Sequence, residues 1–407
     1  MKEIAGGVCA ARGFRAAGIH VGVKTHNLNK KDVALIVSDT MCTAAGVFTT
    51  NVVKAAPVLV SRAHLANGKA RAIVCNSGNA NACAPMGKEN ALRMCDAAAN
   101  ALGCDSGDVL VASTGVIGQM LKVDVIENGI PQLSGLLEAS AAASDAAAHA
   151  IMTTDTVKKE VAVETVIRGK SVRIGGIAKG SGMIHPNMGT MLCFLTTDCA
   201  ISSEMIRAAL LETVQVSFNR ISVDGDTSTN DTCIVLANGM AGNAEIAEKN
   251  GDYSVFVEAL EVLCTKLARM MAKDGEGAKH LITCTVQGAA SGKSAETISK
   301  SVISSTLTKA AIFGCDANWG RVLCAMGYSG ETFDPDKVDV HFVSAAGEIA
   351  VCEQGQGLPF DEELAKKILT EDEVEILIRM GEGDGSCTCW GCDITYDYIK
   401  INGDYRT

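Results

Sequence analysis

A glycine-rich loop that runs directly into an apolar segment constrains this chain more than any other feature of its sequence. Residues 179–190 read Lys-Gly-Ser-Gly-Met-Ile-His-Pro-Asn-Met-Gly-Thr, and residues 191–198 continue as Met-Leu-Cys-Phe-Leu-Thr-Thr-Asp. A polar, glycine-containing stretch before a short apolar run indicates a loop followed by a buried strand. Thr190 stands at the junction, directly after Gly189, in the position where a nucleophile would sit.

A threonine hydroxyl becomes a good nucleophile when a base removes its proton, and cleavage just before the threonine frees an α-amine that can act as this base. Such an amine titrates at about 7.7–8.0 and can therefore accept and return a proton near neutrality. Gly189 suits the cleavage because a residue without a side chain lets the backbone strain and leaves its carbonyl accessible. A strand preceded by a flexible loop is the alternative interpretation of the same residues.

Further motifs extend over nearly the whole chain. Together with residues 179–188 and 190–192 they resemble the glutamate N-acetyltransferases, also called ornithine acetyltransferases, of arginine biosynthesis, in which this loop is the self-cleavage site. The chain departs from the pattern at Gly189, where that family usually has alanine, and this puts the rate of maturation in question. The other motifs are 76–82 (Asn-Ser-Gly-Asn-Ala-Asn-Ala), 112–118 (Ala-Ser-Thr-Gly-Val-Ile-Gly), 153–156 (Thr-Thr-Asp-Thr), 223–231 (Val-Asp-Gly-Asp-Thr-Ser-Thr-Asn-Asp), 273–277 (Lys-Asp-Gly-Glu-Gly), 316–321 (Asp-Ala-Asn-Trp-Gly-Arg) and 390–393 (Trp-Gly-Cys-Asp).

The resemblance implies a fold and a set of site residues. The fold is α/β, a layered α/β/β/α sandwich like that of N-terminal-nucleophile enzymes, followed by a smaller C-terminal α/β domain. Thr190 is the implied nucleophile, Thr114 and Gly115 the oxyanion hole, and the bond between Gly189 and Thr190 the cleavage site. The implied substrate contacts are Thr153, Lys179, Thr190, Glu276, Asn402 and Thr407.

The reaction implied by the resemblance is a ping-pong acetyl transfer from N-acetylornithine to glutamate through an acetyl-Thr190 ester. It needs no cofactor and no metal. Members of the family differ in whether acetyl-CoA is also a donor for glutamate, and no residue decides this here. Cleavage yields an alpha chain (1–189) and a beta chain (190–407), and the family assembles two of each.

Local patterns support some of these roles and leave others open. The apolar run 109–113 predicts a strand that opens at Thr114, where backbone N–H groups could hold an oxyanion; an ordinary turn is the alternative. The glycines around Lys179 lack the spacing of a nucleotide-binding loop, and the lysine is better suited to bind a substrate carboxylate. Glu276 suits an ammonium, although a surface carboxylate is the simpler interpretation. We interpret the acidic segment 224–231 as a structural turn near the site, because it lacks the glutamate that closes a calcium loop.

Composition excludes several classes of partner. The net charge is −11, with 36 Lys and Arg against 47 Asp and Glu, which argues against nucleic acid. We see neither a secretion signal nor an apolar run of about 18 residues, so we expect a cytosolic protein without a membrane span. The 17 cysteines then fill small core volumes as reduced thiols. The cluster Cys387, Cys389 and Cys392 is an incomplete zinc shell, and we expect no metal there.

Periodicity predicts the elements and the domains. We expect a catalytic domain over residues 1–285 and a smaller domain over 286–407, with residues 287–293 as the most linker-like segment. The predicted strands are 33–37, 46–50, 71–75, 109–113, 163–167, 172–174, 281–286, 338–343 and 348–351, with a hairpin turn at 168–171, and the predicted helices are 89–102, 136–152, 202–216, 253–272, 294–312 and 361–369.

Two other functions stay open on the sequence. The nearer one is an N-terminal-nucleophile aminopeptidase or amidohydrolase, in which water resolves the acyl-enzyme. The more distant one is a non-enzymatic thiol or metal-binding protein, which the 17 cysteines would suit. Such a protein would stay in one piece, whereas the self-cleaving enzyme would give two fragments, one beginning at Thr190.

Overall fold

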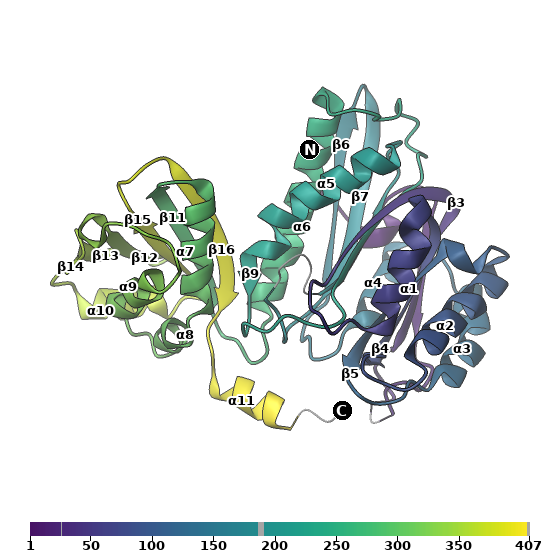
Figure 1. The fold of residues 1–407 in the computed structure, drawn as a ribbon, viewed down its shortest axis with the longest axis horizontal. Helices are drawn as coiled ribbons and strands as arrows, with labels where there is room; N and C mark the ends of the chain where they lie inside the picture. The colour runs from purple at the N-terminus through teal and green to yellow at the C-terminus, as the bar shows by residue number, and fades with distance from the viewer. Residues whose placement is uncertain (26, 186–190, 405–407) are drawn as a thin grey trace.

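The computed structural model describes residues 1–25, 27–185 and 191–404 and has two lobes, each built on its own β-sheet (Figure 1). Within these residues the first sheet has nine strands in the order β1-β6-β7-β8-β10-β3-β4-β5, and β2 pairs with β3. Its strands are β1 (Lys2–Ile4), β2 (Phe14–Ile19), β3 (Val33–Phe48), β4 (Lys69–Asn79), β5 (Val109–Val116), β6 (Lys159–Ile167), β7 (Lys170–Lys179), β8 (Leu192–Thr197) and β10 (Thr232–Ala237).

Strand β3 is long enough to serve two halves of the first sheet. Residues 33–37 pair with β2 and β4, residues 43–48 pair with β10, and the register against β4 shifts between these two stretches. One apolar cluster contains Ile36 and Ile73 from the first half together with Phe194 from the second. The two halves therefore face each other across a shared core.

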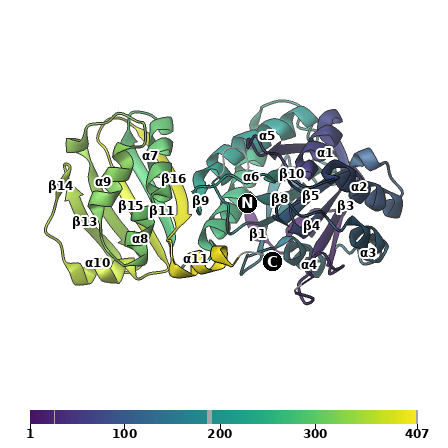
Figure 2. The same cartoon turned by 60° about the horizontal axis from the view of Figure 1, so that its bottom comes forward.

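Helices cover the outer faces of both halves. Three helices pack on the half that contains β4 and β5, two others pack on the half that contains β6 and β7, and α4 fits against β2 between them (Figure 2). The result is the layered α/β/β/α sandwich that the family resemblance implies. The helices are α1 (Ala56–His64), α2 (Gly87–Leu102) and α3 (Val123–Gly135) on one outer face, α5 (Ser203–Val216) and α6 (Gly251–Lys273) on the other, and α4 (Ala141–Ile151).

Strand β8 is buried on both faces, as its apolar sequence predicts. Leu192 and Phe194 point into the core between the half-sheets, whereas Cys193 and Leu195 point toward α5 and α6. Neighbouring side chains alternate in this way because successive residues of a strand face opposite sides of its sheet. The strand that follows the glycine-rich loop thus lies in the middle of the sandwich.

The second lobe is a smaller α/β unit with strand order β14-β13-β12-β15-β11-β16-β9. The short strand β9 follows α5 in the chain and pairs with β16, so it joins the two lobes. The expected domain boundary after residue 285 falls inside β11, and residues 287–293 form the end of β11 and the start of α7. The elements are β9 (Ile221–Ser222), β11 (Leu281–Ala289), β12 (Asp339–Ser344), β13 (Gly347–Glu353), β14 (Gln356–Gly357), β15 (Glu373–Arg379), β16 (Gly385–Cys392), α7 (Gly292–Ser304), α8 (Thr306–Phe313), α9 (Trp319–Gly327) and α10 (Glu362–Leu369).

Two helix predictions are wrong in their bounds. The single helix predicted over 294–312 is two helices, α7 and α8, because Ser305 has an extended backbone and its side chain accepts a hydrogen bond from the Thr308 N–H. The helix predicted over 136–152 begins at Ala141, after Ser140, whose side chain caps it in the same way. The helices predicted over 89–102, 202–216, 253–272 and 361–369 are confirmed as α2, α5, α6 and α10.

Two strand predictions also differ from the structure. The strands predicted at 33–37 and 46–50 belong to the one strand β3, which ends at Phe48. The strand predicted at 71–75 is longer in the structure: residues 76–79 continue β4, because they pair with the equally extended end of β5. The hairpin predicted over 163–174 is confirmed as β6 and β7, with its turn at residues 168 and 169.

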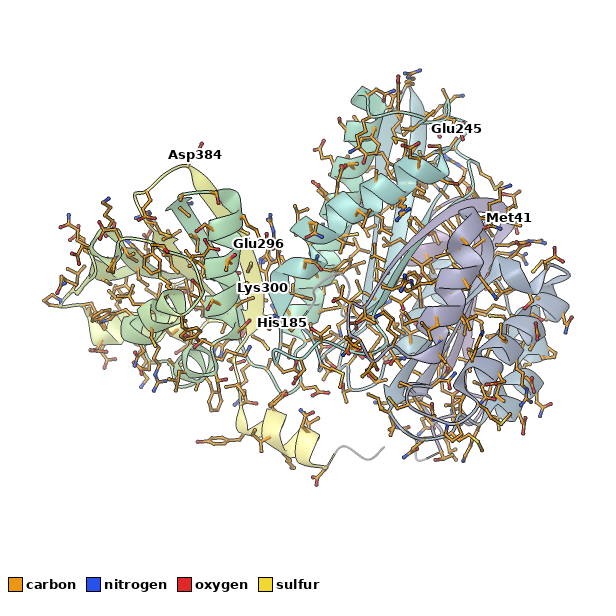
Figure 3. All side chains as sticks on the ribbon, viewed as in Figure 1. Met41, His185, Glu245, Glu296, Lys300 and Asp384 are labelled. Carbon is orange, nitrogen blue, oxygen red and sulfur yellow. The ribbon has the colours of Figure 1, made fainter. Side chains whose placement is uncertain are left out.

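Helix α11 (Tyr396–Gly403) leads from the second sheet back toward the first lobe (Figure 1). His185, Lys300 and Glu296 lie along the junction of the two lobes (Figure 3). No helix among the described residues has the length and apolar character that crossing a membrane requires.

Candidate active site

A cavity of about 370 Å³ brings together every predicted site residue that the structure describes. Its walls come from β5, from the loop after α4, from the end of β7, from the loop after α6 and from α11. Gly189, Thr190 and Thr407 lie outside the described residues. The lining residues are Ala80, Thr114, Gly115, Val116, Ile117, Thr153, Thr154, Lys179, Gly182, Met183, Ser228, Asn230, Glu276 and Asn402.

Thr114 and Gly115 lie at the end of β5, beside the end of β4. Gly115 has a φ of 130°, in the region that favours glycine, and a Cβ there would lie 2.3 Å from the carbonyl carbon of Gly78. Only glycine therefore allows β4 and β5 to approach this closely at the cavity wall.

Lys179 ends β7 and is 8% exposed. Its ammonium donates a hydrogen bond of 3.3 Å to the Thr114 hydroxyl. The lysine predicted to bind the substrate carboxylate is therefore in direct contact with the threonine predicted to stabilise the oxyanion. A buried ammonium next to a hydroxyl forms a region of positive potential that suits a carboxylate or a developing negative charge.

Thr153 follows α4 and is held from behind by Asp155, whose Oδ2 accepts its N–H at 3.0 Å. The neighbouring Thr154 hydroxyl is 2.7 Å from that of Ser181 and thereby ties this loop to the glycine-rich loop after β7. The two threonines thus reach the cavity from a segment that is fixed at several points.

Glu276 and Asn402 form the acidic side of the cavity. The Asn402 side-chain amide donates to Glu276 Oε2 at 2.7 Å and to the Tyr398 carbonyl at 3.0 Å. A Cβ on Gly182 would lie 2.5 Å from the Glu276 carboxyl group, so a side chain at this position would make the carboxylate move from its present place. The interpretation of Glu276 as a surface carboxylate is wrong, because the residue is 7% exposed.

The end of the chain is anchored to the same loop as Glu276. Thr395 caps α11 by accepting the Tyr398 N–H at 3.2 Å, and its hydroxyl donates to the Gly277 carbonyl at 2.8 Å. Asn402 therefore reaches the cavity on a helix whose first turn is fixed beside Glu276.

The sequence analysis missed Ser228 and Asn230, which also line the cavity. The Asn230 side-chain amide donates to the carbonyls of Ala80 at 2.6 Å and Ser113 at 2.8 Å, and so holds the residue before Thr114 in place. From the sequence we interpret their segment, 224–231, as a structural turn near the site; its position agrees with this interpretation, but two of its residues also line the cavity. The next residue, Asp231, has a side-chain oxygen without a hydrogen-bond partner, and burial raises the pKa of its carboxyl group well above the usual value.

A second hollow of about 410 Å³ adjoins this cavity and shares Gly115, Thr153 and Thr154 with it. Lys24, Lys30 and Lys122 line the second hollow. Burial lowers the pKa of Lys24 to about 8. These ammonium groups could hold an anionic ligand.

Other parts of the described structure contribute less to the site. A larger hollow of about 950 Å³ lies over β3 between α1 and α5 and contains no predicted site residue. No group of three or more His, Cys, Asp or Glu among the described residues is arranged to hold a metal ion. Cys387, Cys389 and Cys392 are core residues of β16.

Comparisons with known proteins show similarity to one family over nearly the whole chain. The ArgJ family model matches residues 15–407. The chain is 50% identical over 395 residues to the arginine biosynthesis bifunctional protein ArgJ 1 of Clostridium acetobutylicum, covering 97% of this chain and 96% of that protein. It is 49% identical over 408 residues to the corresponding ArgJ protein of Caldanaerobacter subterraneus subsp. tengcongensis, covering 100% of both.

Two solved structures are also similar to this chain. The arginine biosynthesis bifunctional protein of Bacillus halodurans is 42% identical with a TM-score of 0.50, and the match covers 52% of this chain and 98% of that chain. Ornithine acetyltransferase of Mycobacterium tuberculosis, solved in complex with ornithine, is 40% identical with a TM-score of 0.42, and the match covers 46% of this chain and 98% of that one.

Proposed function

Because the chain belongs to the ArgJ family, we propose that it is an acyltransferase of arginine biosynthesis that moves the acetyl group of N-acetyl-L-ornithine to L-glutamate. The observation that carries this proposal is the single cavity in which Thr114, Lys179 and Glu276 meet. It combines groups for an oxyanion, a carboxylate and an ammonium, which are the groups that this reaction has to bind.

The charges of the cavity suit both substrates. N-acetylornithine carries a carboxylate and a side-chain ammonium, and glutamate carries an ammonium and two carboxylates. Lys179 would bind a carboxylate, and Glu276, held by Asn402, would bind an ammonium. Thr153 also lines the cavity, and Thr407 is the further contact that the family pattern implies. One pocket can therefore serve both halves of the exchange.

We propose that Thr190 is the nucleophile. Its hydroxyl attacks the acetyl carbonyl of N-acetylornithine and gives its proton to its own α-amine, while Thr114 and Gly115 stabilise the oxyanion. The amine then passes the proton to the leaving ornithine amine. Glutamate enters, its amine attacks the acetyl-threonine ester, and the released hydroxyl regains a proton. Acetyl is exchanged between carriers, so no cofactor is required.

This chemistry requires cleavage between Gly189 and Thr190, into chains of residues 1–189 and 190–407. In support, the Bacillus halodurans chain aligns over 98% of its own length while covering 52% of this chain, which is about the share that residues 190–407 make up. We further propose that two chains of each kind form the active assembly, as a heterotetramer.

Intact-mass measurement of freshly purified protein tests the proposal most directly. We expect two fragments, one beginning at Thr190, and an uncut, inactive polypeptide for Thr190→Ala. Thr190→Ser is the matched control, because it keeps a hydroxyl and should still be cleaved. An uncut wild-type chain that transfers acetyl groups at full rate would refute the mechanism.

The second hollow favours acetyl-CoA as an additional donor for glutamate. A phosphate-bearing donor would find Lys24, Lys30 and Lys122 beside Gly115. Lys30→Glu with Lys122→Glu should lower acetylation of glutamate from acetyl-CoA while transfer from N-acetylornithine continues. Equal loss of both reactions would argue against a separate anion site.

An assay with and without glutamate separates the transferase from a hydrolase of the same type. The transferase releases ornithine in turnover only with glutamate present, whereas an amidohydrolase releases ornithine and acetate in its absence.

We propose a cytosolic location, because every cysteine lies among the described residues and all 17 are unpaired, as in a reducing compartment.

A further inference from the structure

We propose that Asp155 is a positioning residue of this site, which aligns Thr153 and Lys179 without lining the cavity itself. The inference rests on the function proposed above and names a residue that the family pattern leaves without a role. Asp155 is 4% exposed and lies behind the cavity wall.

The hydrogen bonds of Asp155 all go to segments that carry site residues or to one buried lysine. Its Oδ1 accepts the Gly180 N–H at 2.7 Å, directly after Lys179, and its Oδ2 accepts the Thr153 N–H at 3.0 Å. Lys159 donates to Oδ1 at 2.6 Å. A single carboxylate therefore fixes two of the segments that form the cavity wall.

Charge supports the same role. Burial alone would raise the pKa of Asp155, but the ammonium groups of Lys179 and Lys159, with the hydrogen bonds from Lys159 and Thr153, outweigh it and hold the pKa well below its usual range. Asp155 is thus a carboxylate throughout the physiological range and a counter-charge for Lys179. Lys179 in turn donates to the Thr114 hydroxyl.

Lys159 extends this cluster to the acidic side of the cavity. Its buried ammonium also contacts Asp274, which accepts the Thr156 N–H at 3.1 Å and lies two residues before Glu276. The cluster of Asp155, Lys159 and Asp274 therefore connects the segments that present Thr153, Lys179 and Glu276.

A merely structural role predicts a different outcome. Removal of one partner from a buried ion cluster is strongly destabilising, so a structural role predicts a lower melting temperature with an unchanged KM. The polar bonds of this cluster converge on the loops of one cavity. Displacement of a binding group by about 1 Å can cost on the order of 100-fold in rate, so a positioning role predicts a loss of kcat/KM in addition to any loss of stability.

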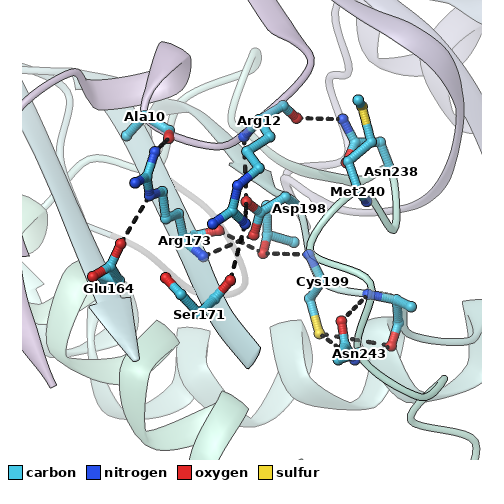
Figure 4. A network of polar contacts seen from close by, with 12 residues as sticks. Ala10, Arg12, Glu164, Ser171, Arg173, Asp198, Cys199, Asn238, Met240 and Asn243 are labelled. Carbon is cyan, nitrogen blue, oxygen red and sulfur yellow. Dashed lines mark hydrogen bonds and ion pairs between the residues drawn. The ribbon is translucent and has the colours of Figure 1, made fainter. Parts of the chain in front are cut away.

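Asp198 is a matched control at the opposite end of the same strands, and Figure 4 shows its contacts with Arg12 and Arg173. It is also fully buried, accepts the Arg173 N–H at 2.8 Å and pairs with Arg12 at 2.7 Å. Lys179 pairs with Leu192 at one end of β8, whereas Asp198 follows Thr197 at the other end. Both aspartates accept backbone N–H groups and bond to one cation, but only Asp155 also faces Lys179 and adjoins the cavity.

The experiment compares the kinetics of Asp155→Asn and Asp198→Asn in soluble, cleaved enzyme. The melting temperature of each variant is measured as well, so that a loss of activity can be compared with the loss of stability. We expect Asp155→Asn to lower kcat/KM on the order of 100-fold, mainly through a higher KM for both N-acetylornithine and glutamate. Asp198→Asn should stay close to wild type. Asp155→Glu, which keeps the charge, should recover part of the loss.

Similar kcat/KM values for the two asparagine variants would overturn the inference. If Asp155→Asn is not cleaved, it gives no KM for the mature enzyme, and Lys159→Gln is measured in its place. When Asp155→Asn is insoluble, Lys159→Gln replaces it with the same expected rise in KM, and an unchanged KM would again refute the role. Wild-type enzyme without acetyl transfer would instead refute the proposed function.

Discussion

The close approach of two backbones at Gly115 shows how a single residue determines the geometry of the cavity. Gly115 has a φ of 130°, and the next glycine along, Gly118, has a φ of 82° with no neighbouring atom within 4 Å of an added Cβ. Both positions favour glycine, but only Gly115 also lacks space for a side chain. A substitution at Gly118 therefore tests backbone strain alone, whereas a substitution at Gly115 tests backbone strain together with the contact between β4 and β5.

Gly115→Ala should abolish most of the activity, because its Cβ would push β5 away from Gly78 and displace Thr114. We expect a kcat loss on the order of 100-fold, as for the removal of an oxyanion donor. Gly118→Ala should cost only about 1–2 kcal/mol of stability and leave kcat unchanged. Steady-state kinetics and melting temperatures test this, and equal kcat losses would contradict it.

Lys179→Met should raise the KM for both amino-acid substrates by roughly 10- to 100-fold, which corresponds to a charged hydrogen bond of about 1.5–3 kcal/mol. Lys309 is the matched control, because it is also buried and its ammonium bonds to the Cys392 carbonyl outside the cavity. Lys309→Met should reduce stability and leave KM unchanged. If soluble Lys179→Met retained the wild-type KM, the carboxylate contact would be wrong.

At the scale of elements, caps and loops decide which helices reach the cavity. Thr395 caps α11, and its hydroxyl also donates to the Gly277 carbonyl. Asp361 caps α10 by accepting the N–H groups of Glu363 and Leu364, far from the site. Both caps stabilise a helix, but only the first positions Asn402.

Thr395→Ala and Asp361→Ala should each cost about 1 kcal/mol of stability, the usual value of a helix cap. Only Thr395→Ala should also raise the KM, since α11 would no longer hold Asn402 against Glu276. Denaturant unfolding and substrate kinetics of both variants check this. An unchanged KM in Thr395→Ala would show that α11 is fixed by other contacts.

His185 makes the junction between the lobes sensitive to acid. Burial and then the charge of Lys300 lower the pKa of His185 to about 4, while Asp224 opposes them and Ser222 is 3.0 Å from its ring. The pKa of His185 in the folded protein lies below the unfolded value of about 6.5. The contribution of this histidine to the stability of the fold is therefore fully present above pH 6.5 and is lost as the pH falls toward 4.

His185→Gln should therefore flatten the decrease of the melting temperature between pH 6.5 and 4.5. The exposed His149→Gln is the control and should keep the wild-type slope. If His185→Gln follows the wild-type slope as well, another group causes the acid sensitivity.

At the scale of the whole molecule, the cut chains would be interleaved in one sheet. β7 precedes the proposed cleavage site and pairs with β8, which follows it, and β3 and β10 pair across the same division. The two chains share the apolar core between the half-sheets. Separation would expose this core to water, which is costly.

We therefore expect the chains of residues 1–189 and 190–407 to remain together at nanomolar dilution and to separate only in denaturant. Native mass spectrometry should show two of each, and the same measurement in urea should show single chains. Dissociation in dilute buffer would contradict the shared core, whereas a stable one-to-one pair would contradict only the proposed heterotetramer.

Local patterns in the sequence were enough for much of the fold. Apolar periodicity predicts β8, α5 and α6 because a strand or helix buries one face at a fixed spacing. The patterns failed where a local cap or a bulge decides, as at Ser305, which divides α7 from α8, and in β3, where one strand serves two half-sheets.

The sequence by itself determined the chemical groups, through motifs that resemble a known family, and it determined most of the elements that carry them. Only the tertiary structure decided that Thr114, Lys179, Glu276 and Asn402 share one cavity, and that Asp155 stands behind it. The physical reason is distance along the chain: Glu276 and Asn402 are 126 residues apart yet hydrogen-bonded. Such contacts depend on how whole layers pack, which local periodicity does not encode.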